Sequence, residues 1–386
     1  MKGFYILDTD TYSDDLKKYV NLSTFCWETI NSDMRFFSLY GNEITLSGFL
    51  NTILKNFYLS SKASVTNLIY KKREEYDSLF NKSQYKNSDK ELIEKIKDDL
   101  IDKYHQELIA ENLSYPKGSG HYFRINNDVA ELLNDTVENS DIDDAGESLG
   151  CYLKVIFEEY SRLPQCERIR VYFKDVVDAI QEAIANKKGI KVIQRPFERF
   201  DKNSEPGTTR IVKTNKYYVK PYKIVSDDSF QYLYLIGLSE LADDSNQLQR
   251  KDMEPHSLRI SLIQRVTILQ SMNGFISKED KERMDERLIA NGPQSFIDPN
   301  DPAKMLEVKV RFDNHGLETL KRVSYGRPKS FKKLDSNTYV FYSDFFQARN
   351  YFWRFANNVE ILEPLSLRES VKKMLALTTA VYKEEE

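Results

Sequence analysis

The segment KYYVKPYKIV, residues 216–225, interleaves three tyrosines with three lysines around a single proline. In an extended strand alternate side chains share one face, so Tyr218, Lys220 and Tyr222 are predicted to line up together. Exposed tyrosines can stack on nucleic-acid bases and lysines can meet phosphates, a sequence-tolerant combination worth about 1–3 kcal/mol per stacked base. Alternatively, some of these tyrosines fill the interior of a folded sheet. The sequence leaves both interpretations open.

Basic and aromatic residues continue on both sides of this segment, although the formal net charge of the chain is −4. Residues 191–220 carry eight basic and three acidic residues, and residues 321–333 carry six basic residues and no acidic one. Residues 131–150, in contrast, carry seven acidic residues and no basic one. Because electrostatic fields act locally, such basic patches can bind a phosphate backbone, or they can be ordinary solvated surface. The candidate nucleic-acid-binding residues are Arg195, Arg199, Arg210, Lys213, Lys216, Tyr218, Lys220, Tyr222, Tyr232, Tyr234, Arg259 and Arg265.

Motifs that would carry catalysis or bind a cofactor are missing from the sequence. It contains no G-x-x-x-x-G-K-[ST] phosphate loop, no H-E-x-x-H, no G-x-S-x-G and no Cys-x-x-Cys pair. We therefore expect a protein that is not an enzyme and that uses no metal and no cofactor. The three cysteines have no paired spacing, the N-terminal residues lack the apolar core of a signal peptide, and no apolar run is long enough to span a bilayer. These features predict a cytoplasmic protein without a membrane partner.

The N-terminal part is predicted to contain one strand and two helices. Residues 34–40, MRFFSLY, have a strand-like composition, and the apolar residues of 45–61 recur with the spacing of one helical face. A second helix is predicted to begin at Ser64, which would cap it. One short strand and two helices bury their apolar face poorly, so we expect this unit to pair with a second copy of the chain.

Apolar residues alternate with period two between residues 189 and 270, with turn residues between the runs. This pattern predicts a small all-β barrel. From residue 305 the predicted order is strand, helix, strand, strand, helix, strand, as in a ferredoxin-like βαββαβ domain, with a closing helix from Ser366. The predicted fold class is α+β multidomain, with an N-terminal module at 1–85, a helical linker with an acidic stretch at 86–168, the barrel at 169–275 and the C-terminal domain at 276–386.

The strands YYVKPYKIV, QYLYLIGL and LRISLIQRVTIL resemble those of the WYL domain, an Sm-like barrel found in bacterial regulators and defence-associated proteins. The tripeptide Gln231-Tyr232-Leu233 stands in the place of the Trp-Tyr-Leu that names the family, and Pro221 and Arg259 fit their family positions. Leu262 stands where the family has a second arginine, and Arg265 is displaced from that position by three residues.

Both ends of the chain carry further resemblances. The C-terminal segment that includes YFWRFANNVEILEPLSLRESV resembles the extension that commonly follows a WYL domain. The N-terminal strand and helices resemble a ribbon-helix-helix module, in which two chains pair their strands into a ribbon that enters the DNA major groove. Arg35, Phe37 and Ser38 are the candidate contact residues of that ribbon. The strand offers few side chains suited to reading bases, which favours a role in dimerisation.

This combination of domains resembles the WYL-domain accessory proteins of type VI-D CRISPR systems, which target RNA. The resemblance implies a homodimeric, non-catalytic protein that binds single-stranded RNA, with DNA as the other possible ligand, and stimulates an RNA-guided CRISPR nuclease directly or through RNA. Two alternatives remain open. One is a transcriptional regulator that binds DNA through the N-terminal ribbon and senses a nucleic-acid or nucleotide ligand through the barrel. The other is a scaffold that only assembles a dimer.

Overall fold

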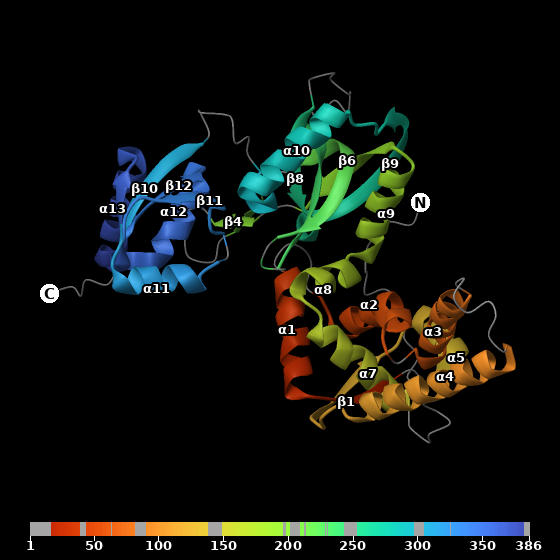
Figure 1. Ribbon diagram of the computed structural model, residues 1–386. Helices are drawn as coiled ribbons and strands as arrows, with labels where there is room; N and C mark the ends of the chain where they lie inside the picture. The colour runs from red at the N-terminus through yellow and green to blue at the C-terminus, as the bar shows by residue number, and fades with distance from the viewer. Residues whose placement is uncertain are drawn as a thin grey trace. The chain divides into compact units, whose positions relative to one another are not determined.

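The computed structural model describes residues 17–38, 44–62, 64–81, 90–137, 149–195, 198–200, 209–211, 214–227, 229, 231–242, 253–296, 305–324 and 326–381. The chain divides into two compact units (Figure 1). Unit 1 contains Met1–Lys174 and Pro196–Ile211, and unit 2 contains Asp175–Arg195 and Val212–Glu386. The described residues form a mixed α/β protein with antiparallel sheets. Among them, no helix is long and apolar enough to cross a membrane.

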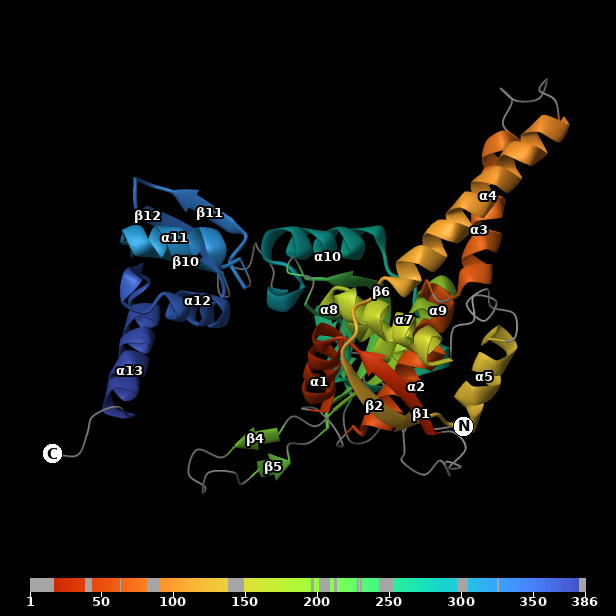
Figure 2. The same cartoon turned by 90° about the horizontal axis from the view of Figure 1, so that it is seen from below.

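Unit 1 combines several helices with a two-stranded ribbon (Figure 2). In the ribbon, β1 (Lys17–Leu22) pairs antiparallel with β2 (Ser119–Arg124). The helices are α1 (Thr24–Ser38), α2 (Leu46–Phe57) with the 3-10 turn η2 (Tyr58–Ser60), α3 (Val65–Phe80), α4 (Lys90–Leu113), α5 (Asn127–Val137), α7 (Leu149–Arg162) and α8 (Gln165–Tyr172).

The core of unit 1 includes one face of α2, the helix that the apolar spacing predicts. Phe49, Leu50, Ile53 and Leu54 of this face have no exposed surface. Burial of each such side chain contributes about 1.5–3 kcal/mol to stability. The predicted second helix corresponds to α3, which begins directly after Ser64, but the Ser64 side chain makes no capping hydrogen bond.

The predicted strand at residues 34–40 is wrong, because the described part of this segment, up to Ser38, belongs to helix α1. A short apolar run such as MRFFS fits a strand or a helix equally well, and the residues that precede it decide between them. Here the helical spacing begins ten residues earlier. The buried positions of the helix are Cys26, Ile30, Asp33 and Phe37, three or four residues apart.

Arg35, Phe37 and Ser38, the candidate contact residues of the predicted strand at 34–40, therefore lie in the last turns of α1. Phe37 is buried and stacks on Tyr172, with ring centroids 4.7 Å apart. The Ser38 hydroxyl donates to the Arg35 carbonyl (2.9 Å), and Arg35 itself is exposed. As helical residues they cannot form a strand that pairs with a second chain. The strand that precedes this helix, β1, pairs with β2 of the same chain.

A buried polar network joins α1 to α7 and α8. Arg168 donates from Nε to Oδ2 of Asp33 (2.6 Å), from Nη2 to Oδ1 (3.2 Å) and from Nη1 to the Leu163 carbonyl (2.6 Å). The Tyr160 hydroxyl donates to the same Asp33 carboxylate (2.8 Å). Burial and this neighbouring carboxylate hold the pKa of Tyr160 well above its usual value, so its hydroxyl remains a donor. Because Asp33 is only 2 % exposed, these donors take the place of water around its carboxylate.

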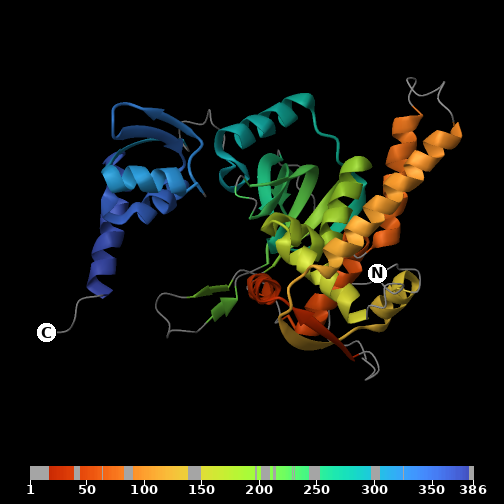
Figure 3. The same ribbon diagram turned by 60° about the horizontal axis from the view of Figure 1, so that its bottom comes forward.

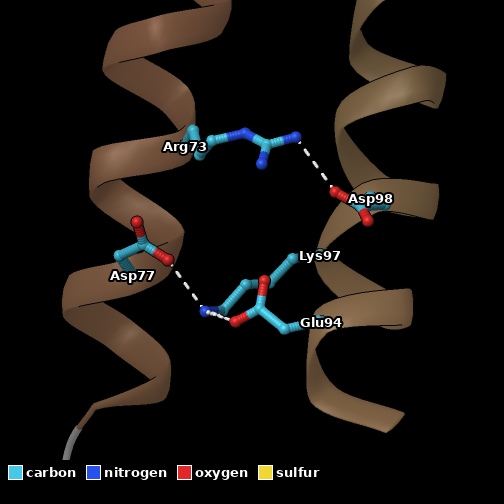
Figure 4. A network of polar contacts seen from close by, with 5 residues as sticks. All are labelled: Arg73, Asp77, Glu94, Lys97 and Asp98. Atoms are coloured by element: carbon cyan, nitrogen blue, oxygen red, sulfur yellow. Dashed lines mark hydrogen bonds and ion pairs between the residues drawn. The ribbon is translucent and has the colours of Figure 1, made fainter. Parts of the chain in front are cut away.

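Helices α3 and α4 form a hairpin that projects from the rest of unit 1 (Figures 2 and 3). Two ion pairs connect the helices (Figure 4): Arg73 Nη2 lies 2.9 Å from Asp98 Oδ1, and Lys97 Nζ lies 2.8 Å from Asp77 Oδ1. Lys97 also contacts Glu94 Oε1 at 2.7 Å. Hydrogen bonds to Asp77 and Glu94 raise the pKa of Lys97, which therefore stays charged. Since pairs with exposed partners contribute at most about 1 kcal/mol each, this network orients the helices more than it stabilises them.

Unit 2 contains a five-stranded antiparallel sheet in the order β8-β7-β6-β3-β9. The period-two segments supply its strands, which are β3 (Lys188–Gln194), β6 (Lys216–Ser226), β7 (Leu233–Leu241), β8 (Glu254–Arg259) and β9 (Ile263–Asn273). The helix α9 (Lys174–Ala185) leads into the sheet, η4 (Ile260–Leu262) joins β8 to β9, and α10 (Lys278–Asn291) and η5 (Pro293–Ser295) follow it. One short segment of the predicted barrel does not join this sheet, because β5 (Thr209–Ile211) pairs with β4 (Glu198–Phe200) instead.

The C-terminal part of unit 2 has the element order that the sequence predicts. Its four strands form an antiparallel sheet in the order β11-β12-β10-β13, with Val308, Val310 and Phe341 in a core shared with Phe352 of α12. The elements are β10 (Leu306–Phe312), α11 (Asn314–Arg322), β11 (Ser330–Lys333), β12 (Thr338–Ser343), α12 (Phe345–Phe352), η6 (Trp353–Asn358), β13 (Val359–Glu363) and α13 (Leu365–Val381).

We expect Arg168→Ala to lower the free energy of unfolding of unit 1 by about 3 kcal/mol or more, because it leaves the buried Asp33 carboxylate without its cation. Of the two tryptophans, Trp27 lies in unit 1 and Trp353 in unit 2. The fluorescence of Trp27 in a Trp353→Phe background therefore reports the unfolding of unit 1 in urea.

Arg170→Ala is the matched control on the same helix. It removes a contact between Arg170 Nε and Glu167 Oε2 (3.1 Å) on side chains that are more than one third exposed. This change should alter the unfolding free energy by less than about 1 kcal/mol. An equal loss of unfolding free energy in Arg168→Ala and Arg170→Ala would contradict the predicted contribution of the Asp33 network to stability.

Candidate nucleic-acid interface

Strand β6, which carries the KYYVKPYKIV segment, is interrupted by a β-bulge. Its register with β7 shifts between Pro221 and Lys223. Pro221 has no amide hydrogen to donate, and it lies just past Val219, the last residue of β6 that pairs with β3. The extra residue of the bulge changes the alternation of side chains. As a result two consecutive residues, Tyr222 and Lys223, reach the same neighbouring helix.

Tyr222 and Lys223 both bind Asp285 of α10. The Tyr222 hydroxyl donates to Oδ2 (3.1 Å), and Lys223 Nζ donates to Oδ1 (2.6 Å). Lys223 and Lys281 place their Nζ atoms 5.0 and 5.8 Å from the Tyr222 ring centroid. Partial burial and the hydrogen bond to Asp285 raise the pKa of Tyr222, so the phenol stays protonated. Tyr222 is half-buried and hydrogen-bonded to α10.

Tyr232 is positioned by the turn that precedes β7. Oδ1 of the buried Asp227 accepts hydrogen bonds from the amides of Gln231 (2.8 Å) and Tyr232 (3.1 Å). The guanidinium of Arg259, which lies opposite Tyr234 in the β7–β8 pairing, is 4.7 Å from the Tyr232 ring centroid. A cation over an aromatic ring is an attractive pair. Tyr232 and Arg259 therefore form one half-buried aromatic and basic pair at the end of the sheet.

Two candidate tyrosines belong to the core. Tyr218 is 6 % exposed and Tyr234 is 7 % exposed. Tyr234 packs in one apolar cluster with Ile236 and with Met284 of α10. Neither ring has an open face for a base, so for these two residues the interior interpretation is the correct one.

Four basic residues lie around Tyr218 on one face of the sheet. Lys216 of β6 and Arg265 of β9 both pair with Ile193 of β3. In the next row, Lys191 lies opposite Tyr218, with its Nζ 5.8 Å from the ring centroid. We call the half-buried residues Lys191, Lys216, Lys220 and Arg265 the basic face.

The basic face lies on the side of the sheet opposite to a buried apolar set of β3 and β6, and on its own side Lys220 pairs with the buried Leu238. Ile190, Val192 and Val219 alternate with its residues along β3 and β6 and are at most 1 % exposed. The strand residues that pair with the basic face and with Tyr218 include one acidic residue, Glu240, which lies opposite Tyr218. An extended surface with clustered cations suits the phosphates of a nucleic-acid backbone.

The other predicted basic residues are not all brought to this surface. The Arg195 amide, directly after β3, donates to the Leu262 carbonyl (2.8 Å). Arg199 and Arg210 lie opposite each other in the β4–β5 ribbon, outside the five-stranded sheet, and their side chains are not among those described. Lys213 lies outside the described residues.

Lys191 and Lys223 are the basic residues that the sequence-based prediction missed. Lys191 belongs to the face because β3 pairs with β6 and β9, and that register is not visible in the sequence. Lys223 reaches α10 because of the bulge at Pro221, which was the available signal.

The histidines and acidic residues of the described chain do not suggest a metal centre. No group of three or more His, Cys, Asp or Glu side chains within the described ranges is placed to hold a metal ion. His256 of β8 places Nδ1 2.8 Å from the Ser239 hydroxyl. Burial lowers the pKa of His256, so it adds no positive charge to the sheet at neutral pH.

Comparison with known proteins gives a match to a solved structure. No protein-family model and no curated protein matches the chain. A crystal structure described as that of a CRISPR Cas-related protein aligns with 99 % of this chain and 98 % of its own, at 22 % sequence identity and a TM-score of 0.66. The proteasome accessory factor B/C (PafBC) of Arthrobacter aurescens aligns with 70 % of this chain and 40 % of its own, at 13 % identity and a TM-score of 0.26. The first similarity shows a shared fold over nearly the whole chain, and the second is too low to indicate one.

We expect Tyr218→Ala to destabilise the five-stranded sheet by about 3 kcal/mol, because it removes a buried aromatic ring from beneath the basic face. Hydrogen–deuterium exchange of the β3 and β6 amides measures this loss directly. Lys220→Ala on the same strand is the control. It should change the free energy of opening, calculated from the exchange rates, by less than about 0.5 kcal/mol. Unchanged exchange in Tyr218→Ala would contradict the assignment of Tyr218 to the core.

Proposed function

We propose that this protein is a non-catalytic accessory protein that binds single-stranded RNA and stimulates an RNA-guided, RNA-cleaving CRISPR effector. The observation that carries the proposal is the similarity, over nearly the whole chain, to the fold of a protein described as CRISPR Cas-related. The resemblance of the sheet strands to the WYL domain, and of the domain order to type VI-D accessory proteins, adds the RNA ligand and the homodimeric state.

The basic face supports a nucleic-acid ligand in this proposal. Its four cations are spread along neighbouring strands, where they can follow successive phosphates. Tyr222 of β6 and Tyr232, which directly precedes β7, are half-buried aromatic residues that can contact bases without reading their sequence. A single strand, with its bases unstacked, fits such a surface better than a duplex does.

The fold within unit 2 is consistent with the WYL assignment. The sheet has five antiparallel strands, and the short turn η4 joins β8 directly to β9. Pro221 lies at the β-bulge of β6, and the Arg259 guanidinium lies over the ring of Tyr232 in the Gln-Tyr-Leu tripeptide. The position that Leu262 occupies, in place of an arginine, lies in η4. Arg265 instead joins the basic face from β9.

The transcriptional-regulator alternative loses the DNA-reading element on which it depends. That alternative requires Arg35, Phe37 and Ser38 on a strand shared between two chains, and these residues are helical. A regulator would need a different duplex-binding surface. Duplex binding is therefore the outcome that separates the two functions.

We predict that the full chain binds single-stranded RNA in a salt-dependent manner and binds duplex DNA more weakly. Each alanine substitution of Lys191, Lys216, Lys220 or Arg265 should lower the slope of log K against log salt concentration by about 0.7, because one phosphate contact is lost. The measurement is a fluorescence-anisotropy titration at several salt concentrations with single-stranded RNA, single-stranded DNA and duplex DNA.

Lys223→Ala is the matched control for this series. It removes a lysine from the same strand, but one that binds Asp285 of α10. Its salt slope should equal that of the unmodified chain. Equal slopes for all five variants, or duplex DNA binding as tight as that of single-stranded RNA, would contradict the proposal.

A further inference from the structure

The β1–β2 ribbon of unit 1, whose strands Figure 2 labels, carries a second set of aromatic and basic residues. The antiparallel register sets Lys17 opposite Arg124 and Tyr19 opposite Tyr122. Residues that lie opposite each other point to the same face, and alternate pairs share that face. All four residues are exposed, Tyr19 at 48 % and Tyr122 at 62 %. Packing in the core of unit 1 therefore does not account for this pair of exposed tyrosines.

The opposite face of the ribbon fixes this orientation. Val20, Leu22 and Phe123 alternate with the exposed residues and are at most 3 % exposed. A shift of one residue would exchange the two faces and expose this apolar set. The tyrosine pair therefore faces outward because the core holds the other side.

Gly120 allows the Tyr19 ring to lie against the ribbon. A β-carbon on Gly120 would come within 2.1 Å of the Tyr19 hydroxyl and 2.4 Å of its Cε2 atom. The Tyr19 and Tyr122 centroids are 5.0 Å apart, and the ring planes are inclined by 57°. Rings inclined in this way cannot both stack on one flat base. Each ring can instead take a base of its own.

The charges of the ribbon suit a polyanion. Strands β1 and β2 contain Lys17, Lys18 and Arg124 and no acidic residue. Lys17 Nζ lies 4.9 Å from the Tyr122 ring centroid, so a cation stands beside an aromatic face. Phosphate contacts from such cations and base stacking on the neighbouring rings are the two components of sequence-tolerant single-strand binding.

We infer that the β1–β2 ribbon is a second binding surface for single-stranded nucleic acid. Tyr19 and Tyr122 stack on two bases, and Lys17 and Arg124 contact the backbone. The surface shares its ligand class with the proposed function but consists of different residues in a different unit.

A two-stranded ribbon can also enter the major groove of duplex DNA, but this ribbon is poorly equipped to read one. Asn21 follows the tyrosines on the exposed face, and its Oδ1 accepts a hydrogen bond from the Gly118 amide (2.6 Å). The centre of the ribbon carries two tyrosines, where base reading uses amide and guanidinium groups. Single strands, which offer open base faces, match the rings.

Photo-crosslinking of the full chain tests the inference without any substitution. A single-stranded RNA of mixed sequence containing 4-thiouridine is bound, irradiated and digested, and crosslinked peptides are mapped by mass spectrometry. We expect crosslinks at Tyr19 or Tyr122. Crosslinks elsewhere on the protein, with none in residues 17–22 or 119–124, would overturn the inference.

Variants of the full chain then measure the contribution of the rings. Tyr19→Ala with Tyr122→Ala should weaken single-stranded RNA binding by at least about fivefold per ring, whereas the two Phe substitutions should keep binding within about twofold. Tyr70→Ala of α3 is the control, because Tyr70 is 61 % exposed and should bind RNA like the unmodified chain. Trp27 fluorescence checks folding, since Trp27 stacks on His121 of β2 with centroids 3.6 Å apart.

A variant without the basic face separates this inference from the proposed function. If the basic face is not an RNA site, its removal leaves affinity unchanged, and loss in the ribbon variant still supports the inference. A ribbon double-alanine variant that is folded and binds single-stranded RNA within twofold of the unmodified chain overturns it. Loss confined to duplex DNA overturns it as well.

Discussion

The buried carboxylate of Glu158 binds the junction between β1 and α1 in unit 1. Glu158 of α7 accepts a hydrogen bond from the Ser23 amide at Oε1 (2.7 Å) and from the Ser23 hydroxyl at Oε2 (2.8 Å). The same hydroxyl oxygen accepts from the Cys26 amide (3.1 Å) in the first turn of α1. Ser23 connects β1 to α1. Glu158 accepts the hydrogen bonds of the Ser23 amide and hydroxyl, which are buried away from water. This junction anchors the end of β1, and burial of Val20, Leu22 and Phe123 sets which face of the β1–β2 ribbon is exposed.

Unit 2 uses a buried carboxylate in a comparable way. Asp227 is 2 % exposed and binds the backbone of the turn between β6 and β7, which places Tyr232 beside Arg259. In both units a buried acidic group orders the backbone, and exposed or half-buried basic and aromatic residues lie on the strands that it positions. Acidic and basic residues are also distributed unevenly along the chain, and electrostatic fields act locally. A net charge of −4 is thus compatible with surfaces that are locally basic.

The sequence was sufficient for elements whose periodicity extends over many residues. The apolar face of α2 and the order of helices and strands in the C-terminal part of unit 2 were predictable because periodicity over several residues indicates each element. Residues 34–38 were assigned wrongly because their apolar run is short and the helix begins at Thr24. The division of tyrosines into core and surface depends on tertiary packing, which buries Tyr218 and leaves Tyr222 half-buried at a bulge. The β1–β2 ribbon joins strands from distant parts of the sequence, and local patterns carry no signal for such a pairing.

Binding of single-stranded RNA to the basic face, as we propose, is tested most directly by lysine footprinting. The full chain is acylated with an amine-reactive reagent, with and without saturating single-stranded RNA, and the labelling rate of each lysine is measured by mass spectrometry. We predict slower labelling of Lys191, Lys216 and Lys220 in the complex and an unchanged rate at Lys223, which binds Asp285. Equal labelling of those three lysines in the free and RNA-bound protein would contradict the claim.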